Sequence, residues 1–165
     1  LLTFSPTPGR LSLMKHNILW FFASCILLAA LLLLGGCARG PRPSHRSKAS
    51  VREMSVTAYC SCKKCCNWKR NWLFKPVVAS GPHKGEPKKV GITASGRKAK
   101  KGTIAADTGH YPFGTVMYIP GYGYGRVEDR GSAMKGANKI DIYFPSHKRA
   151  LEWGRRRANV KVWLP

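Results

Sequence analysis

Short apolar runs separated by glycine and proline fill the C-terminal two thirds of the chain. Such runs, bounded by turn-forming residues, are typical of β-strands. Residues 120–125 are rich in glycine and predict a turn between two strands, and residues 67–90 show little pattern and predict a long loop. Six or seven short strands predict an all-β domain, a small closed β-barrel. The expected strands are residues 55–59, 91–94, 102–106, 115–119, 126–128, 139–144 and 159–164.

One segment has the pattern of a short helix. Ser146 can cap its start, and Gly154 suits its end. Ala150, Leu151 and Gly154 are expected along one face. Trp153 is interpreted as a core or lid residue rather than as a ligand of a bound molecule.

The N-terminal region has a different pattern. Met14 is interpreted as the initiator, with residues 1–13 as an upstream extension outside the fold. The polar start at Lys15 and the apolar run 18–34 are typical of a secretory signal. The ending Leu-Gly-Gly-Cys resembles a bacterial lipoprotein box, which implies a signal peptide at 14–36 and a lipid on Cys37. A transmembrane anchor is the alternative, because about 17 apolar residues reach the lower limit for a span.

Residues 37–54 are rich in Arg, Lys, Pro and Ser and lack an apolar period. They are expected to form a flexible linker, and residues 55–165 to form the single folded domain. If Cys37 carries a lipid, the protein is anchored in the bacterial cell envelope. Ala38 after the lipidated cysteine fits sorting to the outer membrane, facing the periplasm.

The chain has 29 Lys+Arg against 7 Asp+Glu, a formal charge of +22. Such an excess raises nucleic acid as a partner first. A secreted, membrane-tethered location argues against it and favours the anionic cell envelope: peptide-bearing glycan strands and acidic lipid head groups. A basic surface with no specific ligand is the alternative.

Four cysteines follow the first expected strand: Cys60, Cys62, Cys65 and Cys66. Outside the cytoplasm an even number favours two disulfides, with Cys65 and Cys66 paired to Cys60 and Cys62. The alternative is a tetrahedral Cys₄ zinc site, although structural zinc sites usually draw two ligands from a distant segment. A catalytic thiol is disfavoured because no base lies nearby in the sequence. No other cofactor is expected.

All three aspartates of the chain, Asp107, Asp129 and Asp141, lie at polar positions beside apolar runs. A carboxylic acid near a second one in a partly dry groove can keep its proton at neutral pH and donate it. That chemistry breaks glycosidic bonds. Asp107 and Asp129 also suit turns, whereas Asp141 lies between isoleucines within a strand, where aspartate is depleted.

Nine motifs in this order resemble the 3D domain family, which is named for its three aspartates and is similar to the catalytic barrel of membrane-bound lytic transglycosylase A. The resemblance implies a double-psi β-barrel with a groove that holds the aspartates. The motifs are VTAY at 56–59, GITASG at 91–96, GTIAAD at 102–107, PFGT at 112–115, IPGYG at 119–123, EDRG at 128–131, MKG at 134–136, IDIYF at 140–144 and ALEWG at 150–154.

The resemblance also implies cleavage of peptidoglycan between N-acetylmuramic acid and N-acetylglucosamine, with a 1,6-anhydro product and Asp141 as the acid and base. Arg130 stands where a small residue is usual, and would either hold Asp129 ionised or block the groove. The alternatives are a glycan-binding barrel without catalysis and a hydrolase in which Asp129 and Asp141 act on water. The remaining implied site residues are Asp129 and Asp107 in the carboxylate cluster and Tyr59, Thr93, Ser95 and Lys135 as substrate contacts.

Overall fold

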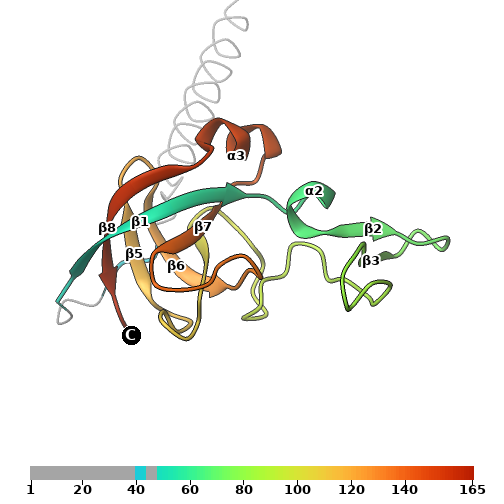
Figure 1. Cartoon of the computed structure of the whole chain (residues 1–165), viewed down its shortest axis with the longest axis horizontal. Coiled ribbons are helices and arrows are strands. Elements are labelled where there is room, and N and C mark those ends of the chain that lie inside the picture. The colour runs from blue at the N-terminus through green and yellow to red at the C-terminus, as the bar shows by residue number, and fades with distance from the viewer. Residues whose placement is uncertain (1–39, 44–47) are drawn as a thin grey trace, which may run out of the picture. The chain divides into compact units, whose positions relative to one another are not determined.

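The computed structural model describes residues 40–43 and 48–165, and six strands of this part close into a barrel (Figure 1). Around the barrel the order is β1-β7-β4-β6-β5-β8. The pairs β1–β7 and β4–β6 are parallel, and the other neighbours are antiparallel. The expected mainly β fold with a closed barrel is confirmed. The strands are β1 (Ser50–Tyr59), β4 (Thr103–Ala106), β5 (Val116–Ile119), β6 (Gly123–Asp129), β7 (Lys139–Tyr143) and β8 (Arg156–Trp163).

The barrel interior follows from the alternation of side chains along each strand. In β7, Ile140 and Ile142 are fully buried in the core, and Asp141 between them faces the other way. In β1, Met54 and Val56 enter the same core. Each such side chain contributes about 1.5–3 kcal/mol to folding.

Strands β4 and β6 approach each other closely at Gly125. A Cβ atom there would lie 2.6 Å from Ile104 Cδ1 and 2.9 Å from the Gly102 carbonyl oxygen. The nearby Tyr122 hydroxyl accepts the Gly102 N–H at 2.8 Å and donates to the Tyr143 carbonyl at 2.8 Å. This contact joins the β5–β6 turn, the start of β4 and the end of β7.

The structure corrects three of the expected segments. Strand β1 begins at Ser50, inside the segment expected as a linker, because residues 50–56 pair with β8. Residues 91–94 form no strand; their turn is held by an isolated bridge between Ile92 and Lys98. The expected long loop contains a small antiparallel hairpin of β2 (Trp68–Arg70) and β3 (Pro76–Val78).

Helix α3 (His147–Trp153) confirms the expected helix, with Ser146 and Gly154 at its cap positions. Its buried face consists of Ala150 and Trp153, and the Trp153 indole N–H donates to the Val56 carbonyl at 3.3 Å. Leu151, expected on the same face as Ala150, is instead 67% exposed. A second helix, α2 (Lys63–Cys66), was not expected.

The predicted lipoprotein signal at 14–36 and Cys37 lie outside the described residues. Within residues 40–43 and 48–165, no helix has both the length and the apolar character needed to cross a bilayer.

Candidate functional site

A groove of about 870 Å³ opens on the barrel, and side chains from β1, β6 and β7 form part of its lining. Asp107, Asp129 and Asp141 all line it, so the fold brings the three predicted carboxylates to one site. Of the predicted substrate contacts, Tyr59, Thr93 and Lys135 also line the groove, and Ser95 does not.

Asp141 lies on β7 opposite Thr57 of β1 and Ala105 of β4. The Thr57 hydroxyl donates to Asp141 Oδ1 at 2.9 Å. Burial raises the pKa of Asp141 to about 6; the Thr57 hydrogen bond opposes this shift, and the negative charge of Asp129 adds to it. The surroundings of Asp141 therefore favour its protonated form.

Asp129 ends β6 and accepts three hydrogen bonds. The Tyr59 hydroxyl donates to Oδ2 at 2.9 Å, and the backbone N–H groups of Ala94 and Arg130 each donate to Oδ1 at 2.9 Å. Both oxygens therefore serve as acceptors. Among the described residues the exposed Arg130 guanidinium makes no ion pair, so Arg130 contacts Asp129 through its backbone.

Tyr59, the last residue of β1, is buried against the edge of Tyr143, with ring centroids 5.4 Å apart. Burial raises the pKa of its hydroxyl, and the Asp129 carboxylate raises it further. Tyr59 therefore keeps its proton and acts as a permanent donor to Asp129.

Asp107 follows β4 and is held by backbone groups. Its Oδ2 accepts the Gly136 N–H at 2.8 Å, and its Oδ1 accepts the Gly109 N–H at 3.1 Å. These bonds, that from Gly136 foremost, lower the pKa of Asp107. The side chain closes its own turn and ties the segment at Gly136 to it, which is the structural role that the sequence also suggested.

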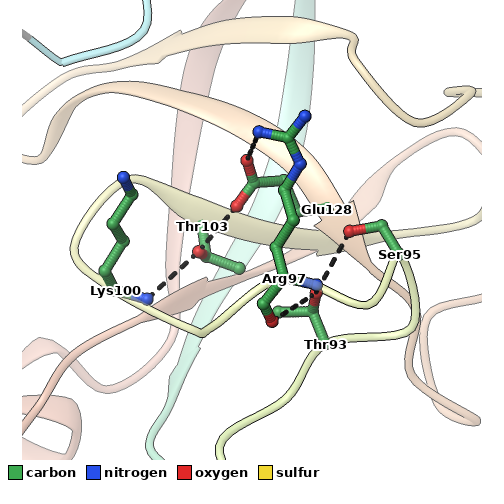
Figure 2. Close-up of polar contacts among 6 residues, drawn as sticks. All are labelled: Thr93, Ser95, Arg97, Lys100, Thr103 and Glu128. Atoms are coloured by element: carbon green, nitrogen blue, oxygen red, sulfur yellow. Dashed lines mark hydrogen bonds and ion pairs between the residues drawn. The ribbon is translucent and has the colours of Figure 1, made fainter.

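The predicted contacts Thr93 and Ser95 belong to a tight turn (Figure 2). Thr93 is only 5% exposed; its hydroxyl donates to the Arg97 carbonyl at 3.0 Å and accepts the Arg97 N–H at 3.2 Å. Ser95 Oγ lies 3.1 Å from Thr93 Oγ1. Both hydroxyls are thus used within the turn that carries the Ala94 N–H.

Glu128, to which the sequence assigned no role, anchors this turn to the barrel. It is buried, with Thr103 donating to Oε2 at 3.1 Å and Arg97 Nη1 lying 3.7 Å from Oε1 (Figure 2). Because Asp129 is the next residue in β6, this anchor holds Ala94 within reach of Asp129. The sequence signal that could have identified Glu128 was a charged residue next to Val127 within an expected strand.

The four cysteines lie beside the groove and are free thiols, so the favoured prediction of disulfides is wrong in this structure. Cys60 Sγ and Cys65 Sγ are 3.7 Å apart, well beyond the bond length of about 2.05 Å. Cys60, Cys62 and Cys65 gather around His147, with one ligand atom of each residue within 4.8 Å of the others, close enough to hold a metal ion. Cys66 instead donates to the Cys60 carbonyl at 3.2 Å.

His147 was missed by the sequence analysis because 82 residues separate it from Cys65. It is the first residue of α3, which follows β7, and β7 pairs in parallel with β1. The end of β1 and the start of α3 are therefore brought together by the barrel. The Phe144 N–H donating to the Tyr59 carbonyl at 2.8 Å fixes that approach.

Comparison with known proteins finds relatives named for the cell wall, both from Bacillus subtilis (strain 168). YabE, whose name describes cell wall shaping, is 32% identical over 124 residues, 72% of this chain and 24% of YabE. The cell wall-binding protein YocH is 41% identical over 76 residues, 44% of this chain and 26% of YocH. The chain thus spans about a quarter of each relative. The family model described as 3D domain matches residues 102–164, and this match supports the 3D domain family for that part of the chain.

Proposed function

We propose that the groove binds peptidoglycan glycan strands and cleaves the bond between N-acetylmuramic acid and N-acetylglucosamine, as a lytic transglycosylase does. The observation that carries the proposal is Asp141, a carboxyl in the groove with a pKa raised to about 6 beside the acceptor Asp129. The cell-wall names of YabE and YocH support a cell-wall substrate.

The charge of the groove suits such a polymer. Lys88, Lys89, Arg130 and Lys135 line it together with the three aspartates. The carboxylates of muramic acid and of its attached peptide provide complementary negative charge. The basic residues would hold the strand, and the carboxyl groups would act on the glycosidic oxygen.

The hydrogen bonding and the raised pKa of Asp141 suit general acid catalysis. Thr57 occupies Oδ1, which leaves Oδ2 to carry the proton that is given to the substrate. With a pKa of about 6, roughly one molecule in ten is protonated at pH 7, against about one in a thousand for a free aspartate. Burial thus raises the active fraction about a hundredfold.

The reaction needs no water. Asp141 protonates the glycosidic oxygen, the bond from that oxygen to C1 of the muramic ring breaks, and N-acetylglucosamine leaves with a free hydroxyl. The C6 hydroxyl of the same muramic ring then attacks C1 and returns its proton to Asp141, closing the 1,6-anhydro ring. The charge of Asp129 stabilises the positive ring formed between the two steps.

The test is digestion of purified sacculi followed by mass analysis of the soluble products. Wild-type protein should release anhydromuropeptides, and Asp141→Asn should release about 10²–10⁴-fold less. Lys135→Gln changes a groove residue proposed to hold the strand and leaves the acid intact, so it should weaken binding without removing the proton donor. Equal product from Asp141→Asn would remove Asp141 from this role, and products with reducing ends would identify a hydrolase instead.

A glycan-binding barrel without catalysis is the second candidate, favoured by the name of YocH. Co-sedimentation with sacculi separates the two: retention of protein without soluble muropeptides supports binding alone. Because fold does not fix activity, this outcome would leave the 3D-domain match intact.

The cell-wall substrate would place the protein in the bacterial cell envelope. We propose that the lipid predicted on Cys37 anchors it at a membrane, the outer membrane if Ala38 acts as the sorting residue. Labelled palmitate should be incorporated by the wild-type chain and not by Cys37→Ser, whereas equal labelling of both would overturn the anchor.

A further inference from the structure

The three thiols and one imidazole beside the groove have the spacing of a tetrahedral metal site. A zinc ion with bonds of about 2.3 Å to sulfur and about 2.0–2.1 Å to nitrogen places two sulfurs about 3.8 Å apart and the nitrogen about 3.5 Å from each sulfur. The Sγ atoms of Cys60 and Cys65 are 3.7 Å apart. His147 Nδ1 lies 3.6, 3.5 and 3.5 Å from Cys60, Cys62 and Cys65.

The local backbone supports thiolates at these positions. Cys62 and Cys65 are three residues apart, a spacing common among zinc ligands, and α2 begins between them. The Cys65 N–H points to Cys62 Sγ at 3.4 Å, and the Cys66 N–H donates to the Cys62 carbonyl at 3.0 Å. An N–H directed at sulfur stabilises the thiolate that a metal requires.

We propose that Cys60, Cys62, Cys65 and His147 Nδ1 bind one structural zinc ion. Three thiolates with one imidazole form a donor set that zinc prefers, and four protein ligands leave no open position for chemistry. The fourth ligand, His147, comes from a distant segment, whereas a Cys₄ site would draw all four ligands from seven residues.

The ion would hold the wall of the groove in place. Cys60 directly follows Tyr59, the donor to Asp129, and Cys65 lines the groove itself. His147 begins α3, whose Trp153 is part of the core. A metal at this point ties β1, α2 and α3 together without taking part in the reaction.

The test measures metal in the full chain, purified in detergent with a reductant and without chelator. Native mass spectrometry and elemental analysis should find one zinc per chain. Cobalt added to the metal-free protein should give the intense visible bands of a tetrahedral thiolate site, and zinc should abolish them. Cys62→Ser and His147→Ala should reduce bound zinc to near zero.

Cys66→Ser is the matched control, since Cys66 adjoins the cluster but is not a ligand, and it should retain one zinc. The cobalt spectrum of the wild-type chain serves as the test if the ligand variants fail to fold. The site is overturned if Cys62→Ser and His147→Ala retain zinc equally, or if Cys66→Ser loses it as they do. Peptide mapping that finds disulfides among these cysteines in the native chain would also overturn it.

Discussion

The carboxylates in the groove and the thiol–imidazole cluster beside it are assembled from the same end of β1, yet they differ in how they use it. Thr57 and Tyr59 donate hydrogen bonds to Asp141 and Asp129, whereas Cys60, the next residue, faces His147. The first site holds a carboxyl, Asp141, whose raised pKa favours the protonated form. The second gathers three thiols and one imidazole close enough together to hold a metal ion. Two adjacent residues, Tyr59 and Cys60, thus contribute to two different clusters of side chains.

The largest expected effects come from one substitution in each site, and each should leave the property of the other site unchanged. Asp141→Asn should lower anhydromuropeptide release about 10²–10⁴-fold and leave bound zinc unchanged. His147→Ala should remove the zinc and lower the melting temperature, because metal-binding free energy is folding free energy. The measurements are product mass analysis, zinc content and circular dichroism melts. Loss of zinc in Asp141→Asn would contradict the separation.

Tyr59→Phe tests the residue at the boundary between the two sites. It removes one of the three donors to Asp129 and should cost about 1.5–3 kcal/mol of unfolding free energy, as for a hydrogen bond to a charged group. Urea unfolding measures this cost, and zinc content should stay at one per chain. A free energy of unfolding equal to that of the wild-type protein would show that this hydrogen bond contributes no stability.

The pH dependence of cleavage tests the role of the carboxylates in the groove. In the proposed reaction the glycosidic oxygen takes its proton from Asp141, so the rate should rise as the pH falls through about 6. Asp129→Asn removes a charge that raises the pKa of Asp141 and should shift the profile to lower pH. Thr57→Val removes a hydrogen bond that lowers this pKa and should shift the profile to higher pH.

Direct titration of the Asp141 side chain by NMR checks the same shifts without substrate. Since the folded pKa is raised above the ordinary value of 3.8, this group binds its proton more tightly in the folded state. Its contribution to stability is present below pH 3.8 and is lost as the pH rises through about 6. Shifts of Thr57→Val and Asp129→Asn in the same direction would contradict the assignment.

Asp107→Asn should have the smallest effect of these changes. The amide keeps one oxygen acceptor for the Gly109 or Gly136 N–H, so the turn should persist with the loss of one bond. We expect a cleavage rate within about threefold of the wild-type rate if Asp107 only positions the segment at Gly136. A loss as large as that of Asp141→Asn would instead give Asp107 a direct part in the reaction.

Much of the barrel could be read from local pattern. Apolar runs bounded by Gly and Pro indicated all six barrel strands, and Ser146 and Gly154 marked the helix ends. The errors came where local signals were weak. Residues 50–54 are largely polar or exposed and form a strand only because β8 lies alongside them. Leu151 was expected on one face with Ala150, although α3 buries Ala150 and Trp153 and leaves Leu151 exposed.

The sequence alone singled out the three aspartates as candidate site residues, because each lies in a short motif beside an apolar run. It also determined that Ile140 and Ile142 face away from Asp141, since side chains alternate along any strand. Only the tertiary structure decided that Asp141 has a raised pKa, that Asp107 is held by backbone donors, and that His147 joins three cysteines. Those outcomes depend on desolvation and on distances between strands far apart in the chain, and neither is encoded in local spacing.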